Sequence, residues 1–233
     1  MLLRDADIKA LQTSHVMIFG LGGVGSYAAE ALGRMGIGKL TIIDGDRFEI
    51  TNCNRQLNAL ASTIGKSKVE VTAQRLHDIN PEADIIPVER FYLPETPVPI
   101  ADDVNFVVDA IDTVTAKLHI IELCSDRNIP VISCMGMGNR LDPTQIKLGD
   151  IFDTSTCSLC RVMRKELRKR HISKLRCVYS SEEACQCAQT APGETSRRAI
   201  PGSVAYVPSV AGLYMAYDVV NTLCNSIDTR EES

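Results

Sequence analysis

The chain has 233 residues, of which 45% are hydrophobic, so it can bury one large core, and two independent domains are not expected. Its formal net charge of -4 neither indicates nor excludes a nucleic-acid partner, because a local basic patch can occur on an acidic protein. The first residues lack the long apolar run of a signal peptide. We therefore expect a cytoplasmic protein whose cysteines are thiols or metal ligands rather than a disulfide framework.

The first elements predict a βαβ unit. Residues 4–13 are typical of a short amphipathic helix, and the apolar run 16–19 predicts a strand. A glycine-rich turn then leads into a helix over 26–35, and the run 40–43 predicts a second strand, which ends at Asp44.

The turn between the first strand and its helix reads GLGGVG, with glycines at Gly20, Gly22, Gly23 and Gly25. Such glycines permit a tight turn and a close approach of backbone to phosphate, and the helix points its N-terminal amides at the anion. Asp44, at the end of the next strand, can bind ribose hydroxyls. The pattern favours a nucleotide site over a turn that merely packs a helix on a strand.

The next elements continue the alternation of strands and helices. The polar stretch 45–56 is expected to be an active-site loop, since it follows a buried strand at its carboxyl end. Lys66 and Lys68 open a predicted helix that runs to about Asn80. The remaining predicted elements are a strand over 85–88, a buried strand over 104–108, a helix capped by Thr113 that runs to about 128, and a strand over 130–134.

This order predicts an α/β fold, a Rossmann-like doubly wound and mostly parallel sheet. The nucleotide-binding part covers about 11–148 of one domain over 1–233, and the alternation stops beyond Gly136. A substrate-side insertion over about 149–205 is expected to be antiparallel or irregular. The sequence beyond Gly136 has a strand-like run at 145–148, a charged segment at 157–176 and a small-residue stretch at 186–202.

A final apolar helix is predicted over about 208–224. Pro208, Gly212, Asp218 and Asn221 interrupt its apolar sequence. We therefore expect a helix that is buried or faces a second subunit, and no membrane span.

Charged side chains are concentrated around the predicted nucleotide site. They are Asp44, Asp46, Arg55, Lys68, Asp109 and Asp112. A nicotinamide cofactor needs few of them, whereas a triphosphate attacked at its α-phosphorus needs cations to neutralise developing charge and an aspartate to hold magnesium. Adenylation is therefore favoured, and the alternative is that Arg55 and Lys68 belong to a solvated loop and helix start.

These motifs resemble the ThiF and MoeB class of ubiquitin-activating-enzyme-like adenylyltransferases. The resemblance covers about 11–148 and rests on GLGGVG, the pair Asp44 and Asp46, Asn52 with Arg55 and Gln56, the helix start at 65–68, and Asp109-Ala110-Ile111-Asp112. It implies ATP and Mg²⁺ as cofactors, with a monovalent cation as a further candidate. The implied nucleotide-binding residues are Gly20, Gly22, Gly23, Gly25, Asp44 on the ribose, Asp46, Asn52, Arg55 and Lys68 on the phosphates, and Asp112 on the magnesium.

The catalytic residues implied by the resemblance are Arg55, Lys68 and Asp112. Members of this class are usually homodimers, and in some of them an arginine reaches the neighbouring nucleotide. Arg4 is the candidate for that role here.

Within the class, the chain is most similar to the branch that acts on threonylcarbamoyladenosine in tRNA. The similarity rests on Lys117 after the 109–112 motif, on the segment 149–151 with 177–180 downstream, and on the lack of a rhodanese domain. It implies ATP-dependent activation of the threonyl carboxylate next to the anticodon, ring closure within the substrate and loss of water. A sulfur-relay protein is a further possible partner.

A basic segment independently favours an RNA substrate. Basic side chains at Arg161, Arg164, Lys165, Arg168, Lys169, Arg170, Lys174 and Arg176 are opposed only by Glu166. On a helix, Arg161, Arg164, Lys165, Arg168 and Lys169 form one stripe that can lie along phosphates. The alternative is a solvated helix face, and a DNA partner is not expected.

Two cysteine pairs complicate the assignment, because relatives often hold a structural zinc with two CxxC pairs. Here Cys157 and Cys160 form a CxxC, but Cys185 and Cys187 form a tighter CxC, so zinc is not expected. Cys177 or Cys187 is a candidate nucleophile or persulfide acceptor, although the sequence identifies no partner base.

Two other functions remain open. One is an adenylyltransferase that activates the C-terminal glycine of a ubiquitin-like sulfur carrier, using the same nucleotide site. The other is a redox or dinucleotide-sensing module without enzymatic activity. The basic segment favours the RNA substrate over both.

Overall fold

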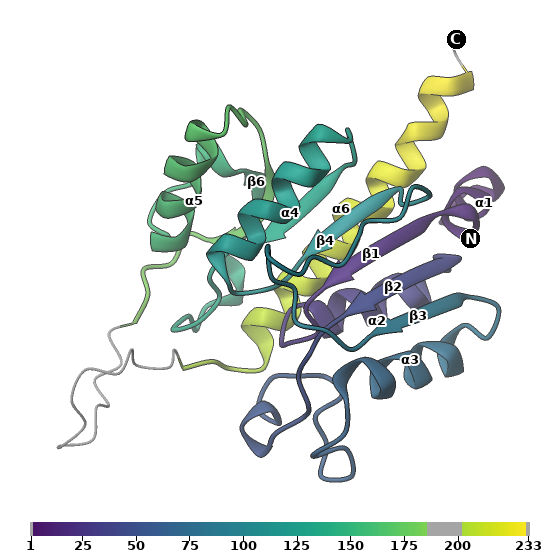
Figure 1. The fold of residues 1–233 in the computed structure, drawn as a ribbon, viewed down its shortest axis with the longest axis horizontal. Coiled ribbons are helices and arrows are strands. Elements are labelled where there is room, and N and C mark those ends of the chain that lie inside the picture. The colour runs from purple at the N-terminus through teal and green to yellow at the C-terminus, as the bar shows by residue number, and fades with distance from the viewer. Residues whose placement is uncertain (1, 186–201, 232–233) are drawn as a thin grey trace.

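A computed structural model describes residues 2–185 and 202–231 (Figure 1). The strands are β1 (His15–Phe19), β2 (Lys39–Ile43), β3 (Asp84–Val88), β4 (Phe106–Asp109), β5 (Val131–Cys134), β6 (Ile146–Asp150) and β7 (Arg176–Ser180). The α-helices are α1 (Asp5–Thr13), α2 (Gly25–Arg34), α3 (Lys68–Ile79), α4 (Val114–Asp126), α5 (Ser158–Lys169) and α6 (Tyr206–Glu231).

The strands form one seven-stranded sheet in the order β3-β2-β1-β4-β5-β7-β6. Every neighbouring pair is parallel except β6 and β7. At the end of β1, Phe19 pairs with Ile43 on one side and Asp109 on the other. The strand order reverses around β1, and open α/β sheets bind ligands at the carboxyl ends of the strands at such a point.

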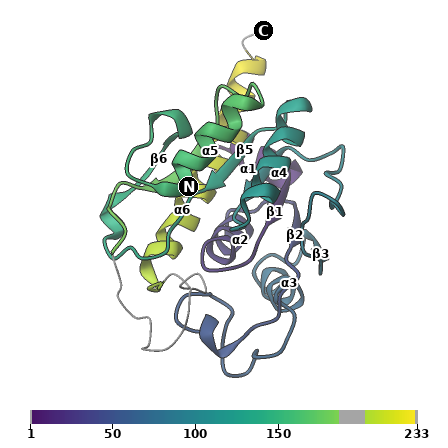
Figure 2. The same ribbon diagram turned by 60° about the vertical axis from the view of Figure 1, so that its left-hand side comes forward.

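Helices cover both faces of the sheet (Figures 1 and 2). α6 contacts α1 and α2, and α2 contacts α3, whereas α4 contacts α5. Buried side chains of β1 therefore pack in two directions: Val16 and Ile18 join the core beneath α2 and α6, and Met17 and Phe19 join the core beneath α4. Burial on both faces explains why β1 and β4 read as continuous apolar runs.

The predicted doubly wound sheet is confirmed, and the parallel part extends further than expected. The alternation was expected to stop beyond Gly136, but α5 leads into β7, which pairs in parallel with β5. β6 completes the sheet as the antiparallel edge strand. The apolar signal of β7 is limited to Cys177, Val178 and Tyr179, and this short run explains why no strand was predicted there.

The last helix is longer than the predicted 208–224. It begins at Tyr206, and its first turn accommodates Pro208 because the amides of that turn have no partner within the helix. A Cβ on Gly212 would lie 2.4 Å from the Val24 carbonyl oxygen, so the glycine permits close packing of α6 on α2. Across the described chain, none of the helices combines the length and hydropathy that a membrane crossing requires. The predicted small-residue stretch lies outside the described residues, apart from Gly202.

Candidate active site

The glycine-rich turn connects β1 to α2 in a conformation that two glycines make possible. Gly20 has a φ of 88°, in the left-handed region that other residues rarely adopt, and its amide donates to the Ile43 carbonyl at 2.8 Å. A Cβ on Gly25 would lie 1.8 Å from the Gly20 carbonyl oxygen. The Ser26 amide of the first turn of α2 donates to the Gly22 carbonyl at 3.1 Å, but no side chain caps this end of the helix, so no side chain competes with an anion for its other amides.

Asp44 links this turn to the loop after β2. One carboxylate oxygen accepts the Leu21 amide at 2.7 Å, and the other accepts the Asp46 amide at 2.8 Å. An ionised carboxylate can accept about four hydrogen bonds, so Asp44 can hold the loops and still accept ribose hydroxyls.

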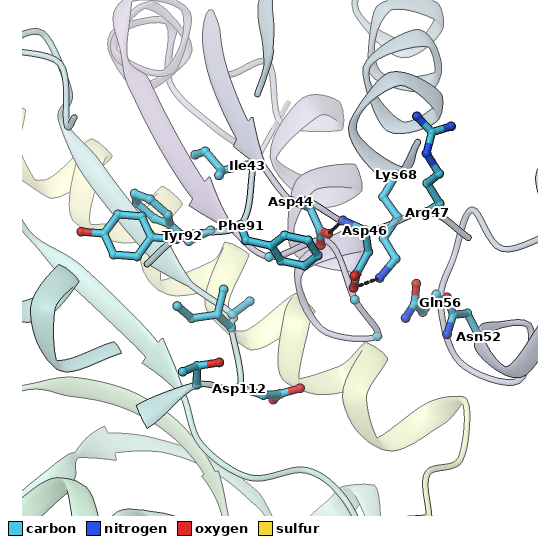
Figure 3. A pocket seen from close by; sticks show the side chains of 18 of the residues that line it. Ile43, Asp44, Asp46, Arg47, Asn52, Gln56, Lys68, Phe91, Tyr92 and Asp112 are labelled. Carbon is cyan, nitrogen blue, oxygen red and sulfur yellow. Dashed lines mark hydrogen bonds and ion pairs between the residues drawn. The ribbon is translucent and has the colours of Figure 1, made fainter. Parts of the chain in front are cut away.

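A pocket of about 390 Å³ opens between these loops at the carboxyl ends of β1, β2 and β4 (Figure 3). It brings together nine of the expected nucleotide-binding residues: Gly20, Gly22, Gly23, Asp44, Asp46, Asn52, Arg55, Lys68 and Asp112. Gly25 is the expected residue that does not line it, because it lies behind Gly20 and supports the turn.

Lys68 provides a buried cation in this pocket. It begins α3, its side chain is 5% exposed, and its Nζ lies 2.8 Å from Asp46 Oδ2. Figure 3 shows this pair between the β2 loop and α3. Since Asp46 is 52% exposed, the ammonium group is oriented by a carboxylate that remains open to solvent.

The loop over 45–56 provides the other polar groups. Arg55 donates to the Thr51 carbonyl and to Asn54 Oδ1, both at 2.9 Å, which orients its guanidinium group. Asn52 is buried and accepts the Glu49 amide at 3.1 Å. Gln56 is also buried at the wall of the pocket, and its Oε1 has no hydrogen-bond partner within the described chain.

Asp112 differs from Asp109, although we expected both at the ligand edge. Asp112 is exposed in the pocket and forms no hydrogen bond or ion pair with any described residue. Asp109 is fully buried away from the pocket, where its carboxylate contacts Lys117 Nζ at 3.0 Å and accepts the Ser133 hydroxyl at 2.6 Å. The expectation for Asp109 was wrong, because its carboxylate forms an internal ion pair.

Two aromatic side chains of this pocket were missed by the sequence analysis. Phe91 and Tyr92 follow β3, and Figure 3 shows Phe91 beside Asp44. A Cβ on Gly45 would lie 2.7 Å from the Phe91 ring, so the glycine permits this packing. The Tyr92 hydroxyl forms a hydrogen bond with His119 Nδ1 at 2.9 Å. Burial raises the pKa of Tyr92 to about 12. The sequence signal that could have identified these two residues is their position just after a predicted parallel strand, where ligand-binding loops begin.

A second cavity of about 370 Å³ adjoins the pocket. The two share Gly22, Gly23, Arg55 and Asp112, and the second cavity continues along the loop 134–138 after β5. A second substrate placed there would lie next to the expected phosphate-binding residues.

The basic stripe lies on α5 and does not line the nucleotide pocket. Buried Cys160, Met163 and Leu167 occupy the opposite face of the helix. Arg164 donates to the Thr154 carbonyl at 2.9 Å, Arg168 stacks 5.3 Å from the centre of the Phe152 ring, and Lys169 pairs with Glu166 at 2.7 Å. Arg161 and Lys165 are exposed and have no ion-pair partner among the described residues.

The other candidates lie away from this pocket. Arg4 is the N-cap residue of α1 and pairs with Asp7 of that helix at 2.8 Å. All described cysteines are free thiols, and the described residues contain no group of three or more metal-ligating side chains. Cys187, a candidate in both the CxC pair and the nucleophile hypothesis, lies outside the described residues.

Comparison with known proteins assigns the class. The ThiF family model matches residues 1–232, so the chain belongs to the ThiF family. The chain is 40% identical over 233 residues to the tRNA threonylcarbamoyladenosine dehydratase of Bacillus subtilis, covering 96% of this chain and 92% of the relative. It is 38% identical over 209 residues to the Escherichia coli protein of that name, covering 82% and 78%.

Solved structures of a dehydratase also match this chain over most of its length. The structure of E. coli tRNA N6-threonylcarbamoyladenosine dehydratase in complex with ATP matches with a TM-score of 0.84 and 30% identity, over 97% of this chain and 91% of that chain. The AMP complex matches with a TM-score of 0.85, 29% identity, and coverage of 97% and 92%. The molybdopterin-synthase adenylyltransferase of E. coli is 31% identical over 162 residues, covering 68% and 64%. The two bacterial dehydratases are therefore more similar to this chain than this adenylyltransferase.

Proposed function

We propose that this protein is an ATP-dependent tRNA threonylcarbamoyladenosine dehydratase. The observation that carries the proposal is the assembly of Arg55, Lys68 and Asp112 around the glycine-rich turn at the switch point of the sheet. The relatives that match most of the chain have this enzymatic activity in their names, and one is solved with ATP. An enzyme is therefore favoured over a redox or dinucleotide-sensing module.

ATP supplies the activation, since attack by the threonyl carboxylate on its α-phosphorus releases pyrophosphate and makes the carboxyl group reactive. Arg55 and Lys68 neutralise the charge that develops on the phosphates, because both are held in place before the reaction. The glycine-rich turn and the α2 amides bind the phosphates, while Asp44 orients the ribose.

Asp112 is the residue that would hold Mg²⁺. Its carboxylate fits this role because it is exposed in the pocket and has no partner among the described residues. Magnesium is usually bound by one or two carboxylates together with substrate phosphates, and it would supply charge neutralisation. Gln56 Oε1 is a further oxygen in the lining of this site, with no hydrogen-bond partner among the described residues.

The modified base is proposed to occupy the second cavity, next to Arg55 and Asp112. There an atom of the substrate attacks the activated carboxyl carbon, closes a ring and expels AMP, so that water is lost overall. The exposed stripe on α5, including Arg161, Lys165 and Arg168, is proposed to contact tRNA phosphates without reading bases. A tRNA substrate also favours a cytoplasmic location.

A homodimer forms part of the proposal. α6 exposes Leu213, Tyr214 and Tyr217, and large apolar side chains gathered on a helix face are typical of an interface. Light scattering of the purified protein tests this assembly. A sulfur-relay partner and a monovalent cation remain proposals carried over from the family resemblance.

The deciding experiment measures ATP turnover with Mg²⁺ in the presence of threonylcarbamoyl-modified tRNA, unmodified tRNA or no RNA. We expect turnover with the modified tRNA and a loss of one water from its modified nucleoside by mass spectrometry. Arg55→Ala should abolish turnover, whereas Arg34→Ala, at the far end of α2, should not. Turnover only with a sulfur carrier that ends in Gly-Gly would establish the alternative adenylyltransferase, and normal turnover by Arg55→Ala would contradict the site.

A further inference from the structure

Two cysteines that the proposed reaction does not use lie together at the start of α5. Cys157 is the N-cap residue, and its Sγ accepts the Cys160 amide at 3.5 Å. Both side chains are buried, with exposed fractions of 3% and 0%. The CxxC spacing places both sulfurs on the first turn of one helix, which is the arrangement of many redox-active dithiols.

Their surroundings divide the pair into a thiolate and a thiol. The Cys160 thiol donates to Cys157, the amides of Cys160, Gly136 and Leu159 add further hydrogen bonds, and the pKa of Cys157 is lowered to about 5 against the opposing effect of burial. The pKa of Cys160 is raised, first by its hydrogen bond to Cys157 and then by burial. A nucleophilic thiolate next to a second thiol is the requirement for disulfide formation.

The other cysteines packed nearby have the opposite character. Burial raises the pKa of Cys177 to about 12 and raises the pKa of Cys134 further. Both are therefore unreactive thiols at neutral pH. The hydrogen-bond donors around Cys157 therefore lower its pKa, whereas burial raises the pKa of its neighbours Cys134 and Cys177.

The chain around the buried Cys157 is exposed, and one of its residues has a strained backbone. Ser155, Thr156 and Ser158 are exposed on either side of Cys157. Thr156 has a φ of 60°, in the left-handed region that is costly for a β-branched residue. A local opening of this segment would expose the thiolate to a small molecule without unfolding α5.

We propose that Cys157 and Cys160 form a redox-active dithiol that a hydroperoxide oxidises to an intramolecular disulfide. The Cys157 thiolate attacks one peroxide oxygen, the O–O bond breaks, and the other oxygen leaves with a proton as water or an alcohol. This step gives a sulfenic acid. The Cys160 sulfur then attacks the Cys157 sulfur and forms the S–S bond, and the hydroxyl group leaves with the thiol proton as water. The two sulfurs supply the two electrons that reduce the peroxide, and a dithiol reductant reverses the reaction.

The disulfide would act on the wall of the second cavity. The backbone of Gly136 is one of the groups that lower the pKa of Cys157, and Gly136 also lines that cavity, so the loss of the thiolate on oxidation would change the surroundings of this part of the loop. We expect the oxidised protein to lose turnover severalfold and to regain it after reduction. This consequence rests on the proposed function, whereas disulfide formation does not.

The test maps the thiols directly. The full-length protein is treated with hydrogen peroxide and then denatured in the presence of iodoacetamide, which blocks the free thiols. Any disulfide is then reduced, the thiols that it releases are labelled with N-ethylmaleimide, and the protein is digested with trypsin. Cleavage after Lys147 and Arg161 gives a peptide, 148–161, whose only cysteines are Cys157 and Cys160. We expect both to carry maleimide after oxidation and carbamidomethyl groups without it. Cys160→Ser should leave no reducible disulfide in this peptide, and Cys124→Ser, in another core cluster, should not change the result.

Two outcomes would overturn the proposal. One is a peptide that stays fully carbamidomethylated at a peroxide dose that oxidises the exposed Cys53. The other is stoichiometric zinc in the purified protein that is lost in Cys157→Ser, because the sulfurs would then be metal ligands. A disulfide that forms without changing turnover would reject only the effect on the cavity.

Discussion

Lys68 Nζ lies 2.8 Å from Asp46 Oδ2, so a nearly buried ammonium group is held at the rim of the nucleotide pocket by an exposed carboxylate. Lys68→Met should remove this cation and lower ATP turnover by about 10²–10³-fold, as expected when one preorganised charge is lost from a transition state. Steady-state pyrophosphate release with modified tRNA measures the loss.

Lys66→Met is the matched control, because Lys66 is exposed just before the same helix. It should leave turnover within about threefold of the unmodified protein. Equal losses in the two variants would contradict a specific role for Lys68.

Substitutions of two glycines in the turn should have different effects, one on the stability of the fold and the other on nucleotide binding. Gly25→Ala places a Cβ 1.8 Å from the Gly20 carbonyl oxygen, so it should destabilise the protein by about 3 kcal/mol or more in urea unfolding. A Cβ on Gly22 would lie 3.9 Å from its nearest neighbour, Gln56 Nε2, and would project into the pocket.

Gly22→Ala should therefore change the free energy of unfolding by no more than about 0.5 kcal/mol. It should weaken ATP binding about tenfold or more, which calorimetry can measure. Normal ATP affinity in the folded Gly22→Ala protein would show that phosphate does not approach this turn.

The buried pair of Lys117 and Asp109 should be important for stability. Lys117→Met leaves a fully buried carboxylate without its cation, which should cost about 3–5 kcal/mol in urea unfolding. The double variant Asp109→Asn with Lys117→Met should recover most of that loss, because it leaves no unpaired charge.

Lys39→Met provides the comparison, because its ion pair with Asp103 is partly exposed. It should destabilise the protein much less than Lys117→Met does, because solvent screens an exposed ion pair. If Lys117→Met were as mild as Lys39→Met, the buried pair would not be a determinant of stability.

Asp103 should make stability depend on pH in the acid range. Hydrogen bonds from Lys39 and His15 lower its pKa to about 2. The unfolded value is about 3.9. A depressed pKa in the folded state stabilises the fold above the unfolded pKa, and this contribution is lost as pH falls from about 4 to about 2.

Urea unfolding of the unmodified protein and Asp103→Asn across this range measures the effect. The difference in stability between the two proteins should shrink as pH falls. A difference that stays constant from pH 4 to pH 2 would show that Asp103 does not titrate as proposed.

The exposed cations of α5 should contribute electrostatically to tRNA binding. The double variant Arg161→Ala with Lys165→Ala should weaken tRNA binding and reduce the salt slope of log K by about 1 for each lost phosphate contact. Filter binding at several salt concentrations measures both quantities. The control, Lys9→Ala with Arg34→Ala, removes two exposed cations from α1 and α2. An equal effect of the two double variants would indicate nonspecific attraction.

Local patterns predicted the nucleotide-binding part of the fold. The apolar run of β1, the GLGGVG turn and Asp44 lie next to one another in the chain, and neighbouring residues can report on a βαβ unit without the rest of the fold. The loop with Arg55 was also predicted, because it follows a buried strand. Phe91 and Tyr92 could have been predicted by the same argument, since they follow β3.

The sequence by itself determined the class of fold, the glycine-rich turn and the basic face of α5, because each depends on short-range spacing. Only the tertiary structure decided between Asp109 and Asp112, three residues apart at one strand end. One carboxylate is directed to a buried lysine and the other into the pocket, and that choice depends on packing against α4 and β5. The joining of β7 to β5 likewise depends on long-range pairing, because five residues with only a short apolar run carry too weak a local signal.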